Sequence, residues 1–169
     1  MKASVIGKFS PMQGSLRLDS TDVRILGILQ ENADVSITDL GERVGLSANG
    51  CWRRIKRLET EGIIKRRVAL LDATMLGAGL TVFVNLRAPE HSDSWLKRFA
   101  ETVQKIPQVV EFYRLTGEND YLLKLQVADI AAYDAIYKRL ISTMVLRDVS
   151  AAFAMEEIKH TSALPLPRL

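Results

Sequence analysis

The sequence has little of what secreted, membrane-spanning or metal-binding proteins require. Its 169 residues include one cysteine and two histidines, so an intrachain disulfide is excluded and no Cys/His/Asp/Glu cluster has metal-ligand spacing. No apolar run approaches the roughly 20 residues of a membrane helix, and the N-terminus lacks the apolar core of a signal peptide. The composition therefore predicts a cytoplasmic protein with no metal and no membrane partner.

The sequence also lacks the motifs of common enzymes. It contains no glycine-rich phosphate-binding loop, no nucleophile elbow and no catalytic triad pattern. Glu156 and Glu157 are neighbours in a predicted strand, so they point to opposite faces and do not form a two-carboxylate site. These absences predict a protein that is not an enzyme and needs no cofactor.

The positive charge is unevenly distributed along the chain. Residues 1–67 carry 12 lysines and arginines against 8 acidic residues, whereas residues 68–169 carry 11 against 12. The whole surplus of the net charge of +3 therefore lies in the first part. A localised basic surface is typical of proteins that bind a polyanion, because each neutralised phosphate releases counterions.

A helix with two different faces is predicted over Leu46–Gly62. Cys51, Ile55 and Leu58 recur at i, i+4 and i+7 and form an apolar stripe. Ser47 is a natural N-cap, and Gly62 is suited to the left-handed position that ends a helix. Basic residues occupy the opposite side, so this helix has a core-facing stripe and a cationic outer edge. Cys51 as a redox sensor is the weaker alternative to a small buried side chain.

The segments around this helix complete a helix-turn-helix. A short helix is predicted over Ser36–Gly45 and a third over Asp19–Asn32, with Asp19 or Ser20 as its cap. Only Gly45–Ser47 separates the second helix from the basic one, and this arrangement places the later helix in the DNA major groove. Ile63–Leu71 has the β-branched and basic composition of a strand that would serve as a wing.

The candidate DNA contacts lie on the basic helix and the wing. Arg53, Lys56 and Arg57 have two open roles, pairing with guanine or with phosphate. Arg54 lies nearer the apolar stripe, where pairing with an acidic neighbour is the alternative, and packing is favoured over base contact for Trp52. The full candidate set is Ser47, Ala48, Asn49, Trp52, Arg53, Arg54, Lys56, Arg57 and Lys65.

The second part of the chain changes to alternating strand and helix patterns. Strands are predicted over Leu80–Ala88, Val109–Thr116, Asp120–Ala128 and Val149–Ile158, and helices over Ser92–Ile106 and Ile130–Thr143. This βαββαβ order is that of a ferredoxin-like fold, in which two helices cover one face of an antiparallel sheet. The other face is predicted to be a large apolar surface that pairs two copies about a two-fold axis, and the residues considered for the faces are Phe83, Asn85, Phe112, Tyr121, Leu123 and Phe153.

These predictions divide the chain into four parts. Residues 1–15 are predicted to be a disordered leader or tag, and residues 16–71 a winged helix-turn-helix. Residues 72–79 form a hinge, and residues 80–169 form a βαββαβ domain for ligand sensing and oligomerisation. The fold class is therefore α+β.

Three stretches resemble the Lrp/AsnC family of transcriptional regulators. They are LDSTDVRILGILQENADVSITDLGERVGLSANGCWRRIKRLETEGII, GENDYLLKLQV and FAMEEIK, and the likeness extends from about Leu16 to Leu164. Ala48-Asn49-Gly50 departs from the family, in which Thr or Pro often precedes the cysteine. The resemblance implies double-stranded DNA as a partner, dimers that assemble into octamers, and an amino acid or related metabolite as effector.

The effector site implied by the resemblance is the family's Gly-x-x-Asp-Tyr loop. Chemistry is compatible with this role, because Gly117 lets backbone amides approach a carboxylate and Asp120 can accept from an α-ammonium group. The alternative is a hairpin turn whose Gly and Asp serve backbone geometry alone. The residues carried over by position are Thr116, Gly117, Glu118, Asp120 and Tyr121.

Two functions remain in competition at this point. The first is a sequence-specific transcriptional regulator whose DNA binding or assembly responds to an amino acid. The second is a nonspecific architectural DNA-binding protein. They differ in the ratio of specific to nonspecific affinity, which is about 10³ or more for a regulator.

Overall fold

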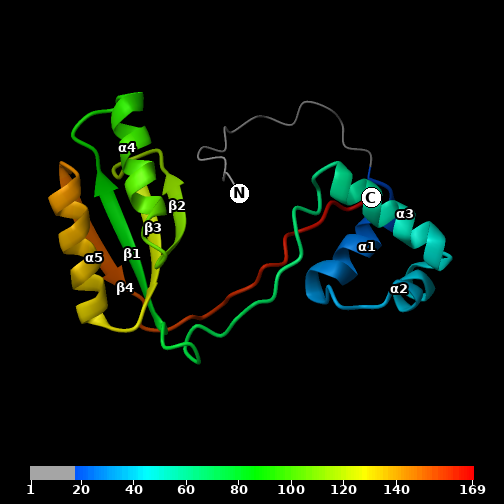
Figure 1. Ribbon diagram of the computed structural model, residues 1–169. Helices are drawn as coiled ribbons and strands as arrows, with labels where there is room; N and C mark the ends of the chain where they lie inside the picture. The colour runs from blue at the N-terminus through cyan, green and yellow to red at the C-terminus, as the bar shows by residue number, and fades with distance from the viewer. Residues whose placement is uncertain (1–17) are drawn as a thin grey trace. The chain divides into compact units, whose positions relative to one another are not determined.

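The computed structural model describes residues 18–169, which form two compact units (Figure 1). The N-terminal unit contains the described residues up to Ala69 together with Lys159–Leu169, and the second unit contains Leu70–Ile158. The predicted leader, residues 1–15, lies outside the described residues. The chain therefore passes between the units twice, once after Ala69 and once after Ile158.

The N-terminal unit contains the three predicted helices. Helix α1 spans Ser20–Glu31, α2 spans Ile37–Val44 and α3 spans Ala48–Thr60. Each begins at a side-chain cap, because Asp19, Ser36 and Ser47 accept hydrogen bonds from backbone amides in the first turns. The core consists of apolar side chains from all three helices: Ile25, Leu26, Leu40, Val44, Cys51, Ile55 and Leu58. The helix-turn-helix and the buried role of Cys51 are confirmed.

The segment predicted as a wing strand has a different conformation. Ile63 and Ile64 pack against the helical core, but residues 65–72 form neither helix nor strand. A strand needs a neighbouring strand to take its backbone hydrogen bonds, and none is paired with this segment among residues 18–169. The predicted strand at Ile63–Leu71 is therefore absent, and Lys65 lies on an exposed, extended segment.

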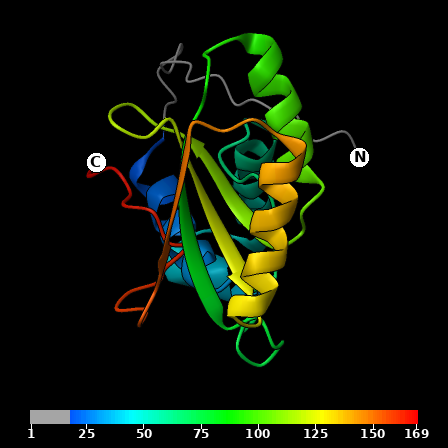
Figure 2. The ribbon, with the colours of Figure 1, turned by 90° about the vertical axis from the view of Figure 1, so that its left-hand side faces the viewer.

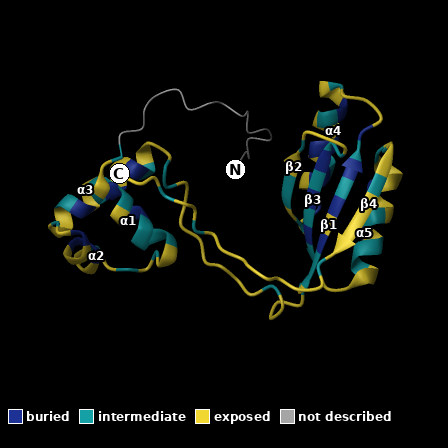
Figure 3. Cartoon of the chain, turned by 180° about the vertical axis from the view of Figure 1, so that it is seen from behind, coloured by how far each residue is buried: buried dark blue, intermediate teal, exposed yellow. Residues whose placement is uncertain are grey.

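The second unit is a four-stranded antiparallel sheet covered by two helices on one face (Figure 2). The strands are β1 (Leu80–Arg87), β2 (Val109–Arg114), β3 (Tyr121–Val127) and β4 (Asp148–Phe153), in the order β2-β3-β1-β4. The helices are α4 (Asp93–Gln104) and α5 (Ile130–Thr143). Buried residues concentrate on β1 and β3, the two central strands (Figure 3). The predicted α+β fold class is confirmed.

The prediction of a large apolar open face on the sheet is wrong in its residues. Phe112 pairs with Leu123 and Phe153 pairs with Val82, which places them on the face that the helices cover. A bulge between Val109 and Glu111 changes the alternation along β2, and sequence alone does not reveal it. Tyr121 and Leu123 are in the core, so only Phe83 and Asn85 of the six residues lie on the open face.

The open face is instead a mixture of polar and apolar side chains. Thr81 donates a hydrogen bond to Gln126 across the strands (2.9 Å), and Lys124 forms an ion pair with Glu111 (3.2 Å). Strand β4 ends at Phe153, five residues before the predicted end. Phe153 pairs with Val82 and β1 begins at Leu80, so at most two further residues could pair with β1, and the Ala154 amide still donates to the Thr81 carbonyl (3.0 Å). No helix among residues 18–169 is long and apolar enough to cross a membrane.

Candidate nucleic-acid interface and ligand-binding loop

Helix α1 holds the recognition helix α3 through one buried carboxylate. Asp22 has no exposed surface, yet its two oxygens accept from Arg54 Nη1 (2.8 Å) and Arg57 Nη2 (2.5 Å). Asp22 also accepts from the backbone amide of Asp19 (3.1 Å), and Asp19 accepts in return from the amide of Asp22 (2.8 Å). This reciprocal capping box joins the start of α1 to two cations of α3.

The charges in this cluster stabilise one another. Burial of Asp22 opposes its ionisation, but hydrogen bonds from Arg57, from the Asp19 amide and from Arg54 outweigh that effect, so the pKa of Asp22 is lowered. The backbone amide of Asp22 and the side chain of Arg54 also lower the pKa of Asp19. Both carboxylates are consequently ionised at neutral pH, and the cluster Asp19, Asp22, Arg54 and Arg57 contains two charges of each sign.

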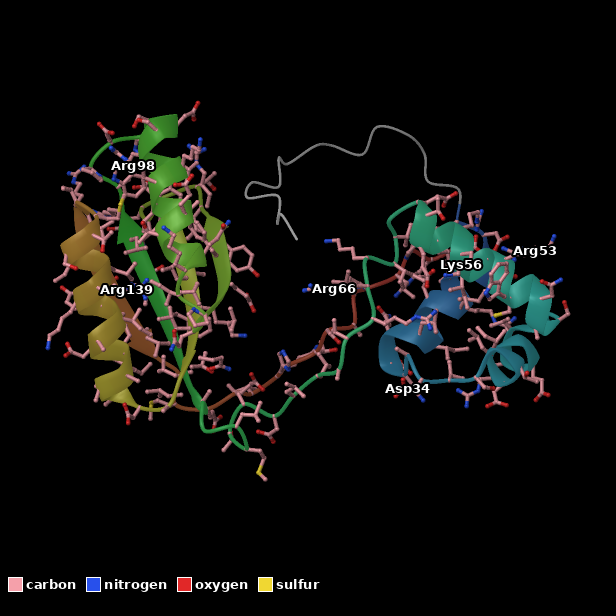
Figure 4. All side chains as sticks on the ribbon, in the orientation of Figure 1. Asp34, Arg53, Lys56, Arg66, Arg98 and Arg139 are labelled. Atoms are coloured by element: carbon pink, nitrogen blue, oxygen red, sulfur yellow. The ribbon has the colours of Figure 1, made fainter. Side chains whose placement is uncertain are left out.

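The outer face of α3 carries the remaining polar side chains. Asn49, Arg53 and Lys56 lie opposite the buried stripe at about 100° per residue, and Arg53 and Lys56 are labelled on this helix in Figure 4. Lys56 forms an ion pair with Glu59 one turn later (2.8 Å). Trp52 is half exposed and lies outside the core, and the preference for packing over base contact stays a prediction.

Arg57 differs from the prediction that it faces away with Arg53 and Lys56. Its guanidinium group turns toward α1 and binds Asp22, and Arg54 makes the pairing that the sequence left open. The acidic partner lies 35 residues earlier, so helical spacing on α3 alone does not predict it. Among the other predicted DNA contacts, Ser47 is the α3 N-cap, and Ala48 and Lys65 are exposed.

The loop between β2 and β3 is closed by backbone hydrogen bonds. The Leu115 amide donates to the Asp120 carbonyl (2.7 Å), and the Asp120 amide donates to the Leu86 carbonyl (3.0 Å). One carboxylate oxygen of Asp120 accepts from the Ala88 amide (2.8 Å). Gly117 has a φ of +117°, a conformation that residues with a side chain rarely adopt. Asp120 therefore fixes this loop to the end of β1.

Tyr121 anchors the loop in the core of the second unit. It is 2% exposed, and its ring packs against Trp95, Phe99 and Phe112 with centroid separations of 5.6–5.7 Å. Burial raises the pKa of its hydroxyl. Thr116, Gly117 and Glu118 lie on the surface side of the same loop. The five predicted residues therefore comprise these three outer residues, Asp120 at the junction with β1, and Tyr121 in the core.

Two residues that sequence reasoning missed lie beside this loop. Arg87, at the end of β1, forms an ion pair with Glu118, and its Nε is buried without a hydrogen-bond partner among the described residues. His91 Nδ1 lies 3.8 Å from the second carboxylate oxygen of Asp120. The antiparallel register that pairs Leu86 with Tyr121 brings the end of β1 to the start of β3. A prediction of that register would have found both residues.

The outer part of the loop is open to solvent, because Thr116, Gly117 and Glu118 are exposed. One hollow on this unit is lined by the end of α5, the α5–β4 connection and the start of β4, and a second is lined by residues within 89–98 and 143–145. Residues 116–121 line neither of these two hollows. Within residues 18–169, no group of three or more His, Cys, Asp or Glu residues is arranged to hold a metal ion. The loop and the adjoining end of β1 together present a cation at Arg87 and anions at Glu118 and Asp120.

Comparisons with known proteins agree with both parts of this description. Residues 18–65 match the winged helix-turn-helix DNA-binding family, and residues 81–164 match the Lrp/AsnC ligand binding domain. The chain is 55% identical over 151 residues to the glutamate uptake regulatory protein of Zymomonas mobilis, covering 89% of this chain and 92% of that protein. It is 45% identical over 150 residues to the DNA-binding transcriptional activator DecR of Escherichia coli, covering 88% and 99%.

Solved structures show the same architecture. The crystal structure of an AsnC family transcriptional regulator from Agrobacterium tumefaciens is 55% identical with a TM-score of 0.84, covering 88% of this chain and 97% of that one. A transcriptional regulator from Neisseria meningitidis in complex with L-Met is 39% identical with a TM-score of 0.83, with the same coverage.

Proposed function

This chain belongs to the Lrp/AsnC family of transcriptional regulators, and we propose that it reads DNA with the outer face of α3 and responds to an amino acid at the 116–121 loop. Family membership makes it a DNA-binding regulator rather than an enzyme. The observation that carries the proposal is the division of the cations of α3 into two groups with different partners. Arg54 and Arg57 are bound to Asp22, whereas Arg53 lies on the exposed face.

On this basis the DNA contacts fall into two groups. Asn49, Arg53 and Lys56 are placed for the major groove, with Trp52 beside them and Ser47 and Ala48 at the helix start. Lys65 is placed for phosphate, because it lies on an exposed segment after the helix. Arg54 and Arg57 act as positioning residues, although Arg57 is 40% exposed and its free edge can still approach phosphate.

Arg53→Ala and Arg57→Ala test this division. We expect Arg53→Ala to weaken specific DNA binding by about 1–3 kcal/mol and to leave the thermal midpoint unchanged. Arg57→Ala should lower the midpoint and change DNA affinity less. Binding is measured at one fixed salt concentration, on the DNA upstream of the chain's own gene and on a scrambled duplex. Equal losses of affinity in the two variants would contradict the division.

The same titrations address the alternative of a nonspecific architectural protein. A regulator should bind its specific site about 10³-fold or more tightly than scrambled DNA. An architectural protein would bind both with similar affinity and with a steep dependence on salt.

The effector is proposed to be an amino acid. The Neisseria relative was solved with L-Met, and the name of the Zymomonas relative refers to glutamate uptake. The loop of this chain has complementary groups for such a zwitterion: the Arg87 guanidinium for the α-carboxylate, and the carboxylates of Glu118 and Asp120 for the α-ammonium. Gly117 allows close approach of the ligand, with Thr116 beside it and Tyr121 anchoring the loop.

Because the loop is open to solvent, we favour an effector site that a second copy of the chain completes. We therefore propose a cytoplasmic homodimer that assembles further, up to an octamer, with the effector bound between copies. Effector binding would then shift assembly through its differential affinity for the assembled states. Size-exclusion chromatography coupled to light scattering, with and without amino acid, measures this shift.

A thermal-shift screen of the protein amino acids tests the effector site. A ligand that binds only the folded protein raises the melting temperature by mass action. Any amino acid that does so should lose its effect in Arg87→Met and in Glu118→Gln but keep it in Glu90→Gln, an exposed acidic control. A normal shift in both loop variants would remove the loop from the proposal.

A further inference from the structure

The C-terminal segment, residues 159–169, docks on α1 of the DNA-binding unit. Gln30 Nε2 donates to the carbonyl of Leu164 (3.2 Å), and the Leu164 amide donates to Gln30 Oε1 (3.0 Å). The two residues are 134 positions apart. One side-chain amide therefore satisfies both backbone groups of Leu164, as a neighbouring strand would.

An apolar contact accompanies these hydrogen bonds. Leu166 packs against the helical core of the N-terminal unit, and Leu166 Cδ1 would lie 3.7 Å from a Cβ built on Gly27. Glycine in the middle of a helix is unfavourable by itself, and here it leaves room for the leucine. Pro165 and Pro167 restrict the backbone on both sides of Leu166, which lowers the entropy lost on docking.

The docking site lies on a separate side of α1 from its other contacts. Asp22 faces α3, and Arg24 donates to the carbonyls of Arg43 and Val44 at the end of α2. Gly27 and Gln30, spaced i and i+3, share a third side. One helix therefore contacts the recognition helix, its supporting helix and a segment that follows the ligand-binding domain.

We propose that this side of α1 is a peptide-binding site for the extended Ala163–Leu166 segment of the chain. It gives the DNA-binding unit a second, non-covalently held connection to the ligand-binding domain, besides the hinge after Ala69. A role of this connection in regulating DNA binding rests on the proposed function, whereas the existence of the binding site does not. Selectivity comes from the Gln30 amide pairing and from the space above Gly27.

A peptide added in trans tests the site directly. The receptor is a variant that ends at Lys159, and the probe is a fluorescent peptide with the sequence of residues 161–169. We expect saturable binding that is at least ten-fold tighter than to the full chain, whose site is occupied. A peptide with Leu166→Asp should not bind. Absence of binding to a truncated chain with native circular dichroism, or equal affinity for the two chains, would overturn the proposal.

A full-length pair of variants provides an independent test should truncation prevent folding. Gly27→Leu fills the space under Leu166, whereas Gly27→Ala places a methyl group at ordinary contact distance. Hydrogen exchange of residues 160–169 should be at least ten-fold faster in Gly27→Leu than in Gly27→Ala. Equal exchange would overturn the docking site. These measurements use neither DNA nor an amino acid, so a negative result would overturn the docking site without bearing on the proposed function.

Discussion

The two units hold their candidate functional surfaces by different means. In the N-terminal unit, ion pairs between side chains fix α3, with Asp22 bound to Arg54 and Arg57. In the second unit, backbone hydrogen bonds and an aromatic core fix the 116–121 loop, with Asp120 bound to the Ala88 amide and Tyr121 buried beneath it. The first arrangement responds to charge and pH, and the second responds to packing.

Because of this difference, Asp22 and Asp120 have different roles. Asp22 links two helices through guanidinium groups, so its contribution depends on remaining ionised. Asp120 accepts from a backbone amide, which is present whatever the neighbouring side chains are. We therefore expect substitutions to act through different observables in the two units.

The largest expected effect is that of removing the core anchor beneath the loop. Tyr121→Ala should destabilise the second unit by about 3–5 kcal/mol, the usual cost of truncating a buried aromatic residue. Urea denaturation followed by fluorescence reports this change, because Trp95 stacks against Tyr121 with centroids 5.7 Å apart. Tyr121→Phe keeps the ring and is the control. Similar midpoints for the alanine variant and the parent would contradict the packing argument.

The next effect concerns the charge cluster of the N-terminal unit. Asp22→Ala leaves two guanidinium groups without their buried partner and removes half of the capping box, and we expect a loss of about 2 kcal/mol. The cost of breaking a fully buried pair is about 3–5 kcal/mol, and solvent reduces it here because Arg54 and Arg57 are 31% and 40% exposed.

Asp34→Ala is the matched control for this change. Asp34 is exposed in the turn after α1, so its removal changes the net charge equally without breaking an ion pair to α3. Denaturant midpoints of both variants decide the comparison. Equal midpoints would show that the Asp22 cluster contributes no more than an ordinary surface carboxylate.

The contrast also explains how much the sequence predicts. Helix starts depend on local capping, so Ser47 was identified from neighbouring residues alone, and the α1 cap was narrowed to Asp19 or Ser20, of which Asp19 is the cap. Helix α5 matches its predicted bounds. The partners of Arg57 and Arg87 depend on chain segments brought together by folding. Helical or strand periodicity along one element does not contain that information.

Strand faces and strand ends were harder to predict for a related reason. The bulge in β2 places Phe112 on the covered face, and the bulge lies in the pairing with β3 rather than in the composition of β2. The segment after Phe153 has strand-like residues, but β1 begins at Leu80 and extends only two residues beyond the Val82–Phe153 pair. The C-terminal docking on α1 was missed because nothing in LPLPRL indicates which surface receives it.

Acid should destabilise the N-terminal unit through the same cluster. The folded-state pKa values of Asp19 and Asp22 lie below the unfolded value of about 3.8. Their contribution is therefore fully present above that pH and is lost as pH falls through the lowered folded values. Unfolding free energies measured from pH 6 to pH 2.5 should fall below about pH 4, and less steeply in Asp22→Asn. Identical slopes in the two proteins would contradict this assignment.

The smallest expected effect on stability is also the sharpest test of the outer face of α3. Glu59 forms ion pairs with Lys56 (2.8 Å) and with Arg67 (3.5 Å). Exposed pairs of this kind contribute roughly 0.2–1 kcal/mol, so Glu59→Gln should scarcely change the denaturant midpoint. If the outer face of α3 contacts DNA as proposed, phosphate competes with Glu59 for both cations in the complex. The substitution should tighten binding about two- to five-fold, within the reach of one or two additional phosphate contacts.

A steeper salt dependence should accompany this gain, since each added phosphate contact changes the logarithmic slope by roughly 0.9. Glu42→Gln, an exposed acidic residue of α2, changes the net charge equally and separates this local release from the general field of the protein. If both variants gave the same affinity and slope, Lys56 would not be among the residues that contact DNA. A gain confined to Glu59→Gln would place the protein–DNA boundary at the outer edge of α3, beyond the ion pairs that fix the helix to α1.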